Sequence, residues 1–206
     1  MSPPKIEEVE GVLPRGDWNG DCIEPTKEGN AALKKGREIK SKNRRRGFFG
    51  VAPPSSEQIE SVGGKPVLLL WFGTFYKRMM SDPRMAVLFD TEDEEAYVSA
   101  AEHGKRLVLA LLSRWTGDGE YHRSYHGGMF HRLSVSHQRA KSCPMRSSNC
   151  QHGQFTKDQR DSWLGHLYLA GQECEVPQTM VEGVTDHLAT VIGVYGPFRE
   201  AKPNEA

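Results

Sequence analysis

Hydrophobic residues recur every three or four positions in several parts of the chain. Leu107 and Leu111 lie four residues apart, and Val108 and Leu112 lie beside them. This spacing places the four side chains on one face of an α-helix, and the run is too long for a typical strand. It predicts a helix over residues 94–115, and similar patterns predict helices over residues 66–80, 156–170 and 177–195.

Polar residues and glycines mark the ends of these helices. Ser55 begins a run that is typical of a helix start, and it predicts a short helix over residues 55–62 that Gly63 and Gly64 interrupt. The sequence contains no alternating strand pattern of useful length and no internal repeat. With a further short helix over residues 130–137, it predicts one all-α domain of five or six helices at 55–198, and a flexible tail at 199–206.

Residues 1–54 have a different composition and are predicted to form an extension. They contain several prolines and glycines and few large apolar side chains, so they bury too little surface to offset their ordering entropy. The stretch 34–46 is strongly basic and ends in Arg44-Arg45-Arg46. We expect a solvated, partly helical and partly disordered arm. A partner-binding arm is the alternative, whereas nucleic-acid binding is not expected because no aromatic platform is interleaved.

The overall charge adds little to this picture. The 27 basic and 27 acidic residues cancel, so no global field attracts the chain to nucleic acid or to an anionic membrane. The longest apolar run, residues 67–72, is too short to span a bilayer. The N-terminus lacks a secretory signal pattern, and a cytoplasmic location is therefore expected.

Three polar side chains are expected to point into the core. His103 shares a helix face with Leu107 and Leu111, Tyr76 follows an apolar run, and Trp163 lies midway along an apolar face. A buried imidazole, phenol or indole needs a hydrogen-bond partner. Three such groups directed at one core suggest a pocket with a polar occupant.

Zinc is an alternative occupant, at a different position. The polar stretch that follows the predicted helix at 130–137 offers ligands of the right type, but their spacing matches none of the compact paired-ligand patterns. No serine elbow or activated-cysteine signature indicates a catalytic triad. A zinc-stabilised helical protein thus stays an alternative, and its candidate ligands are His137, Cys143, Cys150 and His152.

Several segments together resemble the truncated haemoglobins, in particular the group with a tryptophan in the distal pocket. They are VGGKPVLLLWFGTFY at 62–76, DPRMAVLF at 82–89, HGKRLVLALLSRWTGDGEY at 103–121, HRLSVSH at 131–137 and FTKDQRDSWL at 155–164. The glycine pair, its spacing to Tyr76 and the Arg-Asp-x-Trp-Leu run are fairly specific in combination. The resemblance implies a globin-like helical sandwich around haem b.

The resemblance also implies roles for individual residues of the pocket. Tyr76 would donate a hydrogen bond to the bound ligand, and Trp163 matches the distal indole. His103 falls at the gate position of the distal helix, and Leu107 would line the distal wall. Phe89 would pack against the haem ring, although core packing explains Phe89 and Leu107 equally well.

The implied iron ligand is a histidine before the Arg-Asp-x-Trp segment. His137 is the expected ligand, His152 is the alternative, and His131 is a more distant third. Arg106 and Tyr121 match positions that hold the haem propionates. The sequence also departs from the family pattern, because the acidic segment before His103 is longer than usual and Ser136 replaces an arginine that often precedes the ligand.

The resemblance implies a protein that binds O2, NO or CO. A pocket rich in hydrogen-bond donors stabilises the partial negative charge on bound O2 and predicts slow O2 release. Slow release suits redox use, such as NO dioxygenation or a peroxidase-like activity with an external electron donor, better than oxygen transport. The alternatives are a globin-like scaffold for sensing or partner binding and the zinc-stabilised protein.

Overall fold

The chain folds into helices throughout the part that the structure describes. The structure is a computed structural model, and it describes residues 26–44, 46, 50–86, 88–89, 99–117 and 156–195, without the side chains of 194 and 195. These residues contain no β-strand, so the predicted all-α class is confirmed. The helices are α1 (Lys27–Asn43), α2 (Ser56–Ser61), α3 (Gly64–Ser81), α4 (Pro83–Ala86), α5 (Ala100–Trp115), α8 (Lys157–Glu173), α9 (Gln178–Val191) and the 3-10 helix η3 (Ile192–Tyr195).

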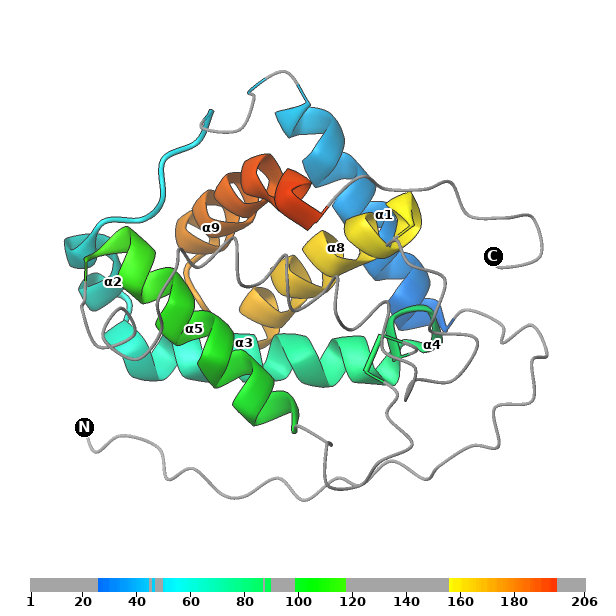
Figure 1. Ribbon diagram of the computed structural model, residues 1–206, viewed down its shortest axis with the longest axis horizontal. Coiled ribbons are helices and arrows are strands. Elements are labelled where there is room, and N and C mark those ends of the chain that lie inside the picture. Colours follow the sequence, from blue (N-terminus) through cyan, green and yellow to red (C-terminus); the bar gives the residue numbers. More distant parts are fainter. Residues whose placement is uncertain are drawn as a thin grey trace.

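Two helix pairs enclose the core. Helix α5 packs on α3, α9 packs on α8, and α3 also contacts α8, which joins the two pairs (Figure 1). Trp71, Phe72 and Phe75 of α3 are fully buried between them. The indole N–H of Trp71 donates a hydrogen bond of 2.8 Å to the backbone carbonyl of Leu167, so this large polar side chain is satisfied inside the core.

Local capping residues begin several helices close to their predicted positions. Ser55 and Gln58 form a capping box at the start of α2, and Thr156 and Gln159 form another at the start of α8. Helix α3 begins before the predicted residue 66, and Gly63 precedes it with a φ of 106°. Only glycine adopts this left-handed backbone at little cost. The first residues of the helix predicted at 94–115 and all of that at 130–137 lie outside the described residues.

The predicted extension is partly helical, as expected, but its helix packs against the domain, which was not predicted. Thr26 caps α1 by accepting a hydrogen bond from the backbone N–H of Gly29. Ala32, Leu33 and Ile39 are buried on the side of α1 that faces α8 and α9. The expectation of a solvated arm is therefore wrong for residues 27–43, whereas residues 1–25 lie outside the described part.

Small residues at the contact between α1 and α8 explain why the pattern of hydrophobic positions did not predict that α1 packs on the domain. Gly36 of α1 lies so close to α8 that an added Cβ would be 1.6 Å from the carbonyl oxygen of Asp161. At Gly165 of α8, an added Cβ would be 1.7 Å from the carbonyl oxygen of Ala32. The two backbones therefore touch, and this contact buries little large apolar side-chain surface. Figure 1 shows α1 crossing the first turns of α8.

The basic residues of α1 bind groups of its own domain. Lys42 forms an ion pair of 2.8 Å with Asp186 of α9, and the amide of Asn43 donates a hydrogen bond to the same carboxylate. Lys40 donates a hydrogen bond of 2.8 Å to the carbonyl of Ala189, in the last turn of α9. A cation at this end of a helix also interacts favourably with the helix dipole. The basic run thus fixes α1 to α9.

Among the described helices, none is long and apolar enough to cross a membrane.

Candidate functional site

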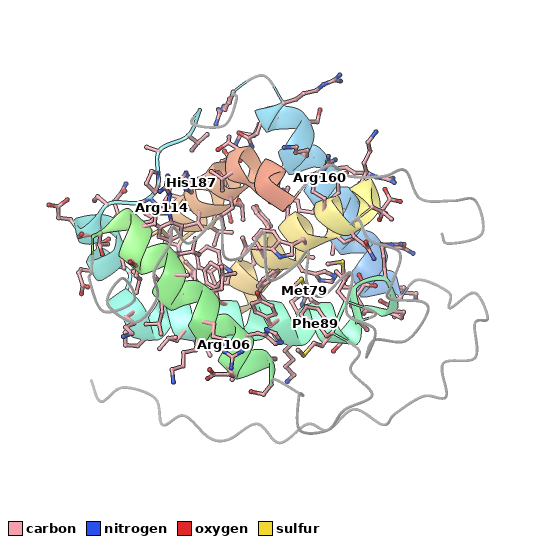
Figure 2. All side chains as sticks on the ribbon, viewed as in Figure 1. Met79, Phe89, Arg106, Arg114, Arg160 and His187 are labelled. Carbon is pink, nitrogen blue, oxygen red and sulfur yellow. The ribbon has the colours of Figure 1, made fainter. Side chains whose placement is uncertain are left out.

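Three of the predicted pocket residues contact one another through their rings. Tyr76 comes from α3, His103 from α5, and Phe89 follows α4. The Tyr76 and His103 rings are stacked, with centroids 5.1 Å apart and an interplanar angle of 18°. Phe89 contacts both edge-on, at 5.9 Å from Tyr76 and 5.4 Å from His103. Three separate segments thus meet at one cluster, which Figure 2 locates by the label on Phe89.

Trp163 lies next to this cluster and reaches it through Phe75. The Phe75 and Trp163 rings meet edge-on at 5.0 Å, and Phe75 also meets Tyr76 edge-on at 4.9 Å. Phe75 is fully buried, whereas Trp163 and Tyr76 are partly exposed. The sequence singled out Tyr76 and Trp163 but missed Phe75, because a buried phenylalanine on an apolar helix face carries no signal beyond packing.

The polar groups of Tyr76 and Trp163 lack partners among the described residues. Neither the Tyr76 hydroxyl nor the Trp163 indole N–H donates a hydrogen bond there, whereas the indoles of Trp71 and Trp115 both do. Burial raises the pKa of Tyr76, so its phenol keeps its proton at any physiological pH. The cluster therefore presents two neutral donors that have no acceptor in the described part of the chain.

Helix α5 brings His103 to the cluster through close contact with α3. Gly104 lies against Gly73, and an added Cβ at Gly104 would be 2.7 Å from the Gly73 nitrogen. The two helices can approach this closely because Gly104 lacks a side chain, whereas an added Cβ at Gly73 would lie 4.0 Å from its nearest neighbour, Ala101 Cα. Leu107, one turn beyond His103, is buried in the core. The predicted inward direction of this face of α5 is thus found in the structure.

Arg106 does not reach the cluster. It lies on the exposed side of α5, where its Nε donates a hydrogen bond of 3.0 Å to Glu102 (Figure 2). Lys105 is 3.9 Å from the same carboxylate. Tyr121, the other residue predicted to hold a haem propionate, lies outside the described residues.

The candidate metal ligands all lie outside the described part of the chain. This holds for the expected iron ligand His137 and its alternatives His152 and His131, and also for Cys143 and Cys150 of the zinc alternative. Within the described part, no group of three or more His, Cys, Asp or Glu side chains could hold a metal ion. The choice between these ligands is therefore still a prediction.

A second histidine network ties α5 to α9. The indole N–H of Trp115 donates a hydrogen bond of 3.3 Å to Nε2 of His187, whose Nδ1 donates one of 2.7 Å to the carbonyl of Val51. One nitrogen accepts and the other donates, so the imidazole is neutral in this arrangement. Burial lowers the pKa of His187, and the positive charge of Arg114 adds to this effect.

A third histidine is paired with an aspartate in the interior. His166 of α8 donates a hydrogen bond of 2.8 Å from Nε2 to the carboxylate of Asp82, and both side chains are only 1% exposed. Neither Asp82 nor His166 was predicted as a functional residue. Proximity of two residues so far apart in the chain leaves no local pattern that sequence reading can detect.

Comparison with known proteins adds no relative. No family model matches this chain, and neither a curated protein nor a solved structure does. The resemblance to truncated haemoglobins is therefore still a prediction from the residues.

Proposed function

We propose that the chain is a haem protein that binds small gas ligands, with Tyr76 and Trp163 as hydrogen-bond donors to the ligand. One observation carries the proposal: Tyr76, His103 and Phe89, predicted as pocket residues from three distant segments, contact one another. Trp163 is joined to these residues through the ring of Phe75, which contacts both Tyr76 and Trp163. Tyr76 and Trp163 are partly exposed, so their donors can reach a group that is bound at the cluster.

The chemistry of this donor set fits a diatomic ligand on iron. A haem would supply the iron that binds O2, NO or CO, and His137 or His152 would hold it. Tyr76 and Trp163 donate protons in hydrogen bonds and carry no charge, which suits a ligand with partial negative charge on its outer atom. Phe89 and Leu107 contribute apolar surface, which excludes water and strengthens these hydrogen bonds.

The donors also favour one use of the ligand over another. A hydrogen bond to a charged acceptor stabilises a bound state by about 1.5–3 kcal/mol, which slows release by a factor of roughly ten to a hundred. Slow release is unsuited to oxygen transport. We therefore propose redox use of bound O2, such as NO dioxygenation, with electrons from an external donor.

The first test is the absorption spectrum after haem reconstitution, in the ferric and the dithionite-reduced states. Wild type is compared with His137→Ala and His152→Ala. We expect a sharp Soret band that is lost in only one of the two variants, which identifies the iron ligand. If wild type shows no specific haem band, the proposal is wrong. Acid release of zinc without haem would then support the zinc-stabilised alternative.

The second test removes the donors one at a time. Tyr76→Phe and Trp163→Phe are each expected to raise the O2 dissociation rate about tenfold or more. Tyr168→Phe is a matched control, because this buried tyrosine on α8 already accepts a hydrogen bond from Gln178 and contacts Lys35 through its ring. An equal effect of Tyr168→Phe and Tyr76→Phe would show that neither acts through the ligand.

A further inference from the structure

The buried Asp82–His166 pair lies where α3, α4 and α8 meet. Asp82 caps the C-terminal end of α3, and its backbone carbonyl accepts hydrogen bonds from the backbone N–H groups of Met85 and Ala86 in α4. Its second carboxylate oxygen accepts one of 3.1 Å from the backbone N–H of Arg84. The carboxylate thus fixes the corner between α3 and α4, while His166 fixes the same corner to α8.

Each member of the pair lies on, or directly after, a helix that carries one of the two donors, Tyr76 or Trp163. Asp82 immediately follows the last residue of α3, the helix that carries Tyr76. His166 follows Trp163 on α8 by three residues, which is slightly less than one helical turn. A bond between Asp82 and His166 therefore sets the axial position of α3 relative to α8 close to both donors.

We propose that Asp82 and His166 form a positioning pair that sets the spacing of the Tyr76 and Trp163 donors, and that α1 keeps this pair dry. The role of the donors toward a ligand rests on the proposed function, whereas their spacing does not. Among the described residues, the ring contacts of the aromatic cluster do not involve Asp82 or His166, so both act through the helices that carry the donors.

Helix α1 covers one side of the Asp82–His166 pair and shields it from solvent. An added Cβ at Gly29 would be 2.8 Å from Oδ1 of Asp82 and 2.9 Å from Oδ2, so the backbone of α1 lies directly against the carboxylate. The guanidinium of Arg84 is 3.2 Å from the Ser162 hydroxyl and 3.5 Å from the Gly29 carbonyl. These contacts exclude water, and exclusion of water strengthens the hydrogen bond between Asp82 and His166.

The hydrogen bonds of the His166 ring define what a substituted side chain must provide. Its Nε2 donates to Asp82, and its buried Nδ1 has no partner among the described residues. A neutral imidazole with the proton on Nε2 leaves only an acceptor unpaired, whereas an imidazolium would bury an N–H without an acceptor. A glutamine can present an N–H donor at this position, but a leucine cannot.

The test measures the Trp163 environment in the protein without haem. Its emission is obtained as the difference between each protein and the same protein carrying Trp163→Phe. His166→Leu is expected to shift this emission to longer wavelength, and His166→Gln to restore most of it. Gly29→Ala should act in the same direction as His166→Leu, because it displaces the carboxylate while leaving both partners present. His187→Leu is the matched control, since it removes another buried, hydrogen-bonded histidine.

The haem-loaded protein supplies the second readout. His166→Leu is expected to change the O2 dissociation rate several-fold and to shift the infrared C–O stretch of the CO complex. In a Tyr76→Phe/Trp163→Phe background, His166→Leu should have no further effect on either, because the pair acts only through the donors. Additive effects in that background would overturn the proposal.

The two proposals fail in different ways. If wild type binds no haem, the proposed function is wrong, and the Trp163 emission still decides whether the pair sets the donors. If His166→Leu does not fold, Gly29→Ala and His166→Gln carry the test. A Trp163 emission that is unchanged in Gly29→Ala, or equally shifted in His187→Leu, would overturn the positioning role.

Discussion

Polar groups are paired differently around α1 and at the aromatic cluster of Tyr76, His103 and Phe89 with its neighbour Trp163. Around α1, charged and amide groups bind one another: Arg37 pairs with Asp158 at 2.9 Å, and Lys42 with Asp186 at 2.8 Å. At the aromatic cluster, the Tyr76 hydroxyl and the Trp163 indole N–H have no acceptor among the described residues. Glycines allow close helix contact near both places, Gly36 and Gly165 between α1 and α8, and Gly104 between α5 and α3.

This difference separates groups that hold the fold from groups that are available to a ligand. Tyr76 and Trp163 are partly exposed, so water or a ligand can pair with their donors without breaking a hydrogen bond of the fold. The paired groups around α1 are expected to respond to mutation through stability. The aromatic cluster is expected to respond through ligand binding.

The largest effect is expected at the crossing of α1 and α8. Gly165→Ala would place a Cβ 1.7 Å from the Ala32 carbonyl oxygen, so the two backbones must separate. We expect a loss of about 3 kcal/mol or more in the free energy of unfolding, measured by urea denaturation.

Gly183→Ala on α9 is the control for this substitution. Apart from the nearby backbone of α9 itself, no atom of the described residues lies within 4 Å of the added Cβ, and alanine favours the helix, so a gain of about 0.5–1 kcal/mol is expected. A neutral Gly165→Ala would show that α1 does not pack on α8 as described.

The next largest effect is expected at Asp186. Its carboxylate is 2.8 Å from Lys42 and 3.6 Å from Arg46, and it accepts a hydrogen bond from Asn43. Asp186→Ala leaves these groups without their shared acceptor and is expected to cost about 2 kcal/mol of unfolding free energy. Asp158→Asn, which removes a more exposed pair with Arg37, should cost less than about 1 kcal/mol. Equal costs would contradict the greater burial of Asp186.

A smaller effect is expected from pH, through His187. Because the pKa of His187 is lowered in the folded state, the unfolded chain binds the proton more readily below the ordinary value of 6.5. Stability should therefore fall as pH decreases from about 7 to 5, by at most about 1.4 kcal/mol per pH unit. His187→Gln should reduce this slope in urea titrations at stepped pH. An unchanged slope would exclude His187 as its source.

The smallest effect on stability is expected at Tyr76. Its hydroxyl has no partner among the described residues, so Tyr76→Phe removes no hydrogen bond there and should change the unfolding free energy by less than about 0.5 kcal/mol. Thermal unfolding of the protein without haem measures this. A loss as large as that of Asp186→Ala would show that the hydroxyl is paired, and the contrast between α1 and the aromatic cluster would disappear.

Local signals in the sequence determined most of the helices that the structure describes. The capping pairs Ser55–Gln58 and Thr156–Gln159 start α2 and α8, because a side chain that satisfies the first backbone N–H groups acts within a few residues. The inward direction of His103 also follows from local spacing to Leu107. These features depend on neighbours along the chain, which a sequence displays directly.

The docking of α1 and the pairing of Asp82 with His166 depended on tertiary structure. The buried face of α1 includes the small residues Gly29, Ala32 and Gly36, and such residues stabilise a contact only when another part of the chain lies close enough to touch them. An aspartate at a helix end and a histidine within a later helix likewise have no relation until the chain folds. Periodicity reports which face of a helix is apolar, but only the partner surface decides whether a face of small residues is buried and which polar groups meet.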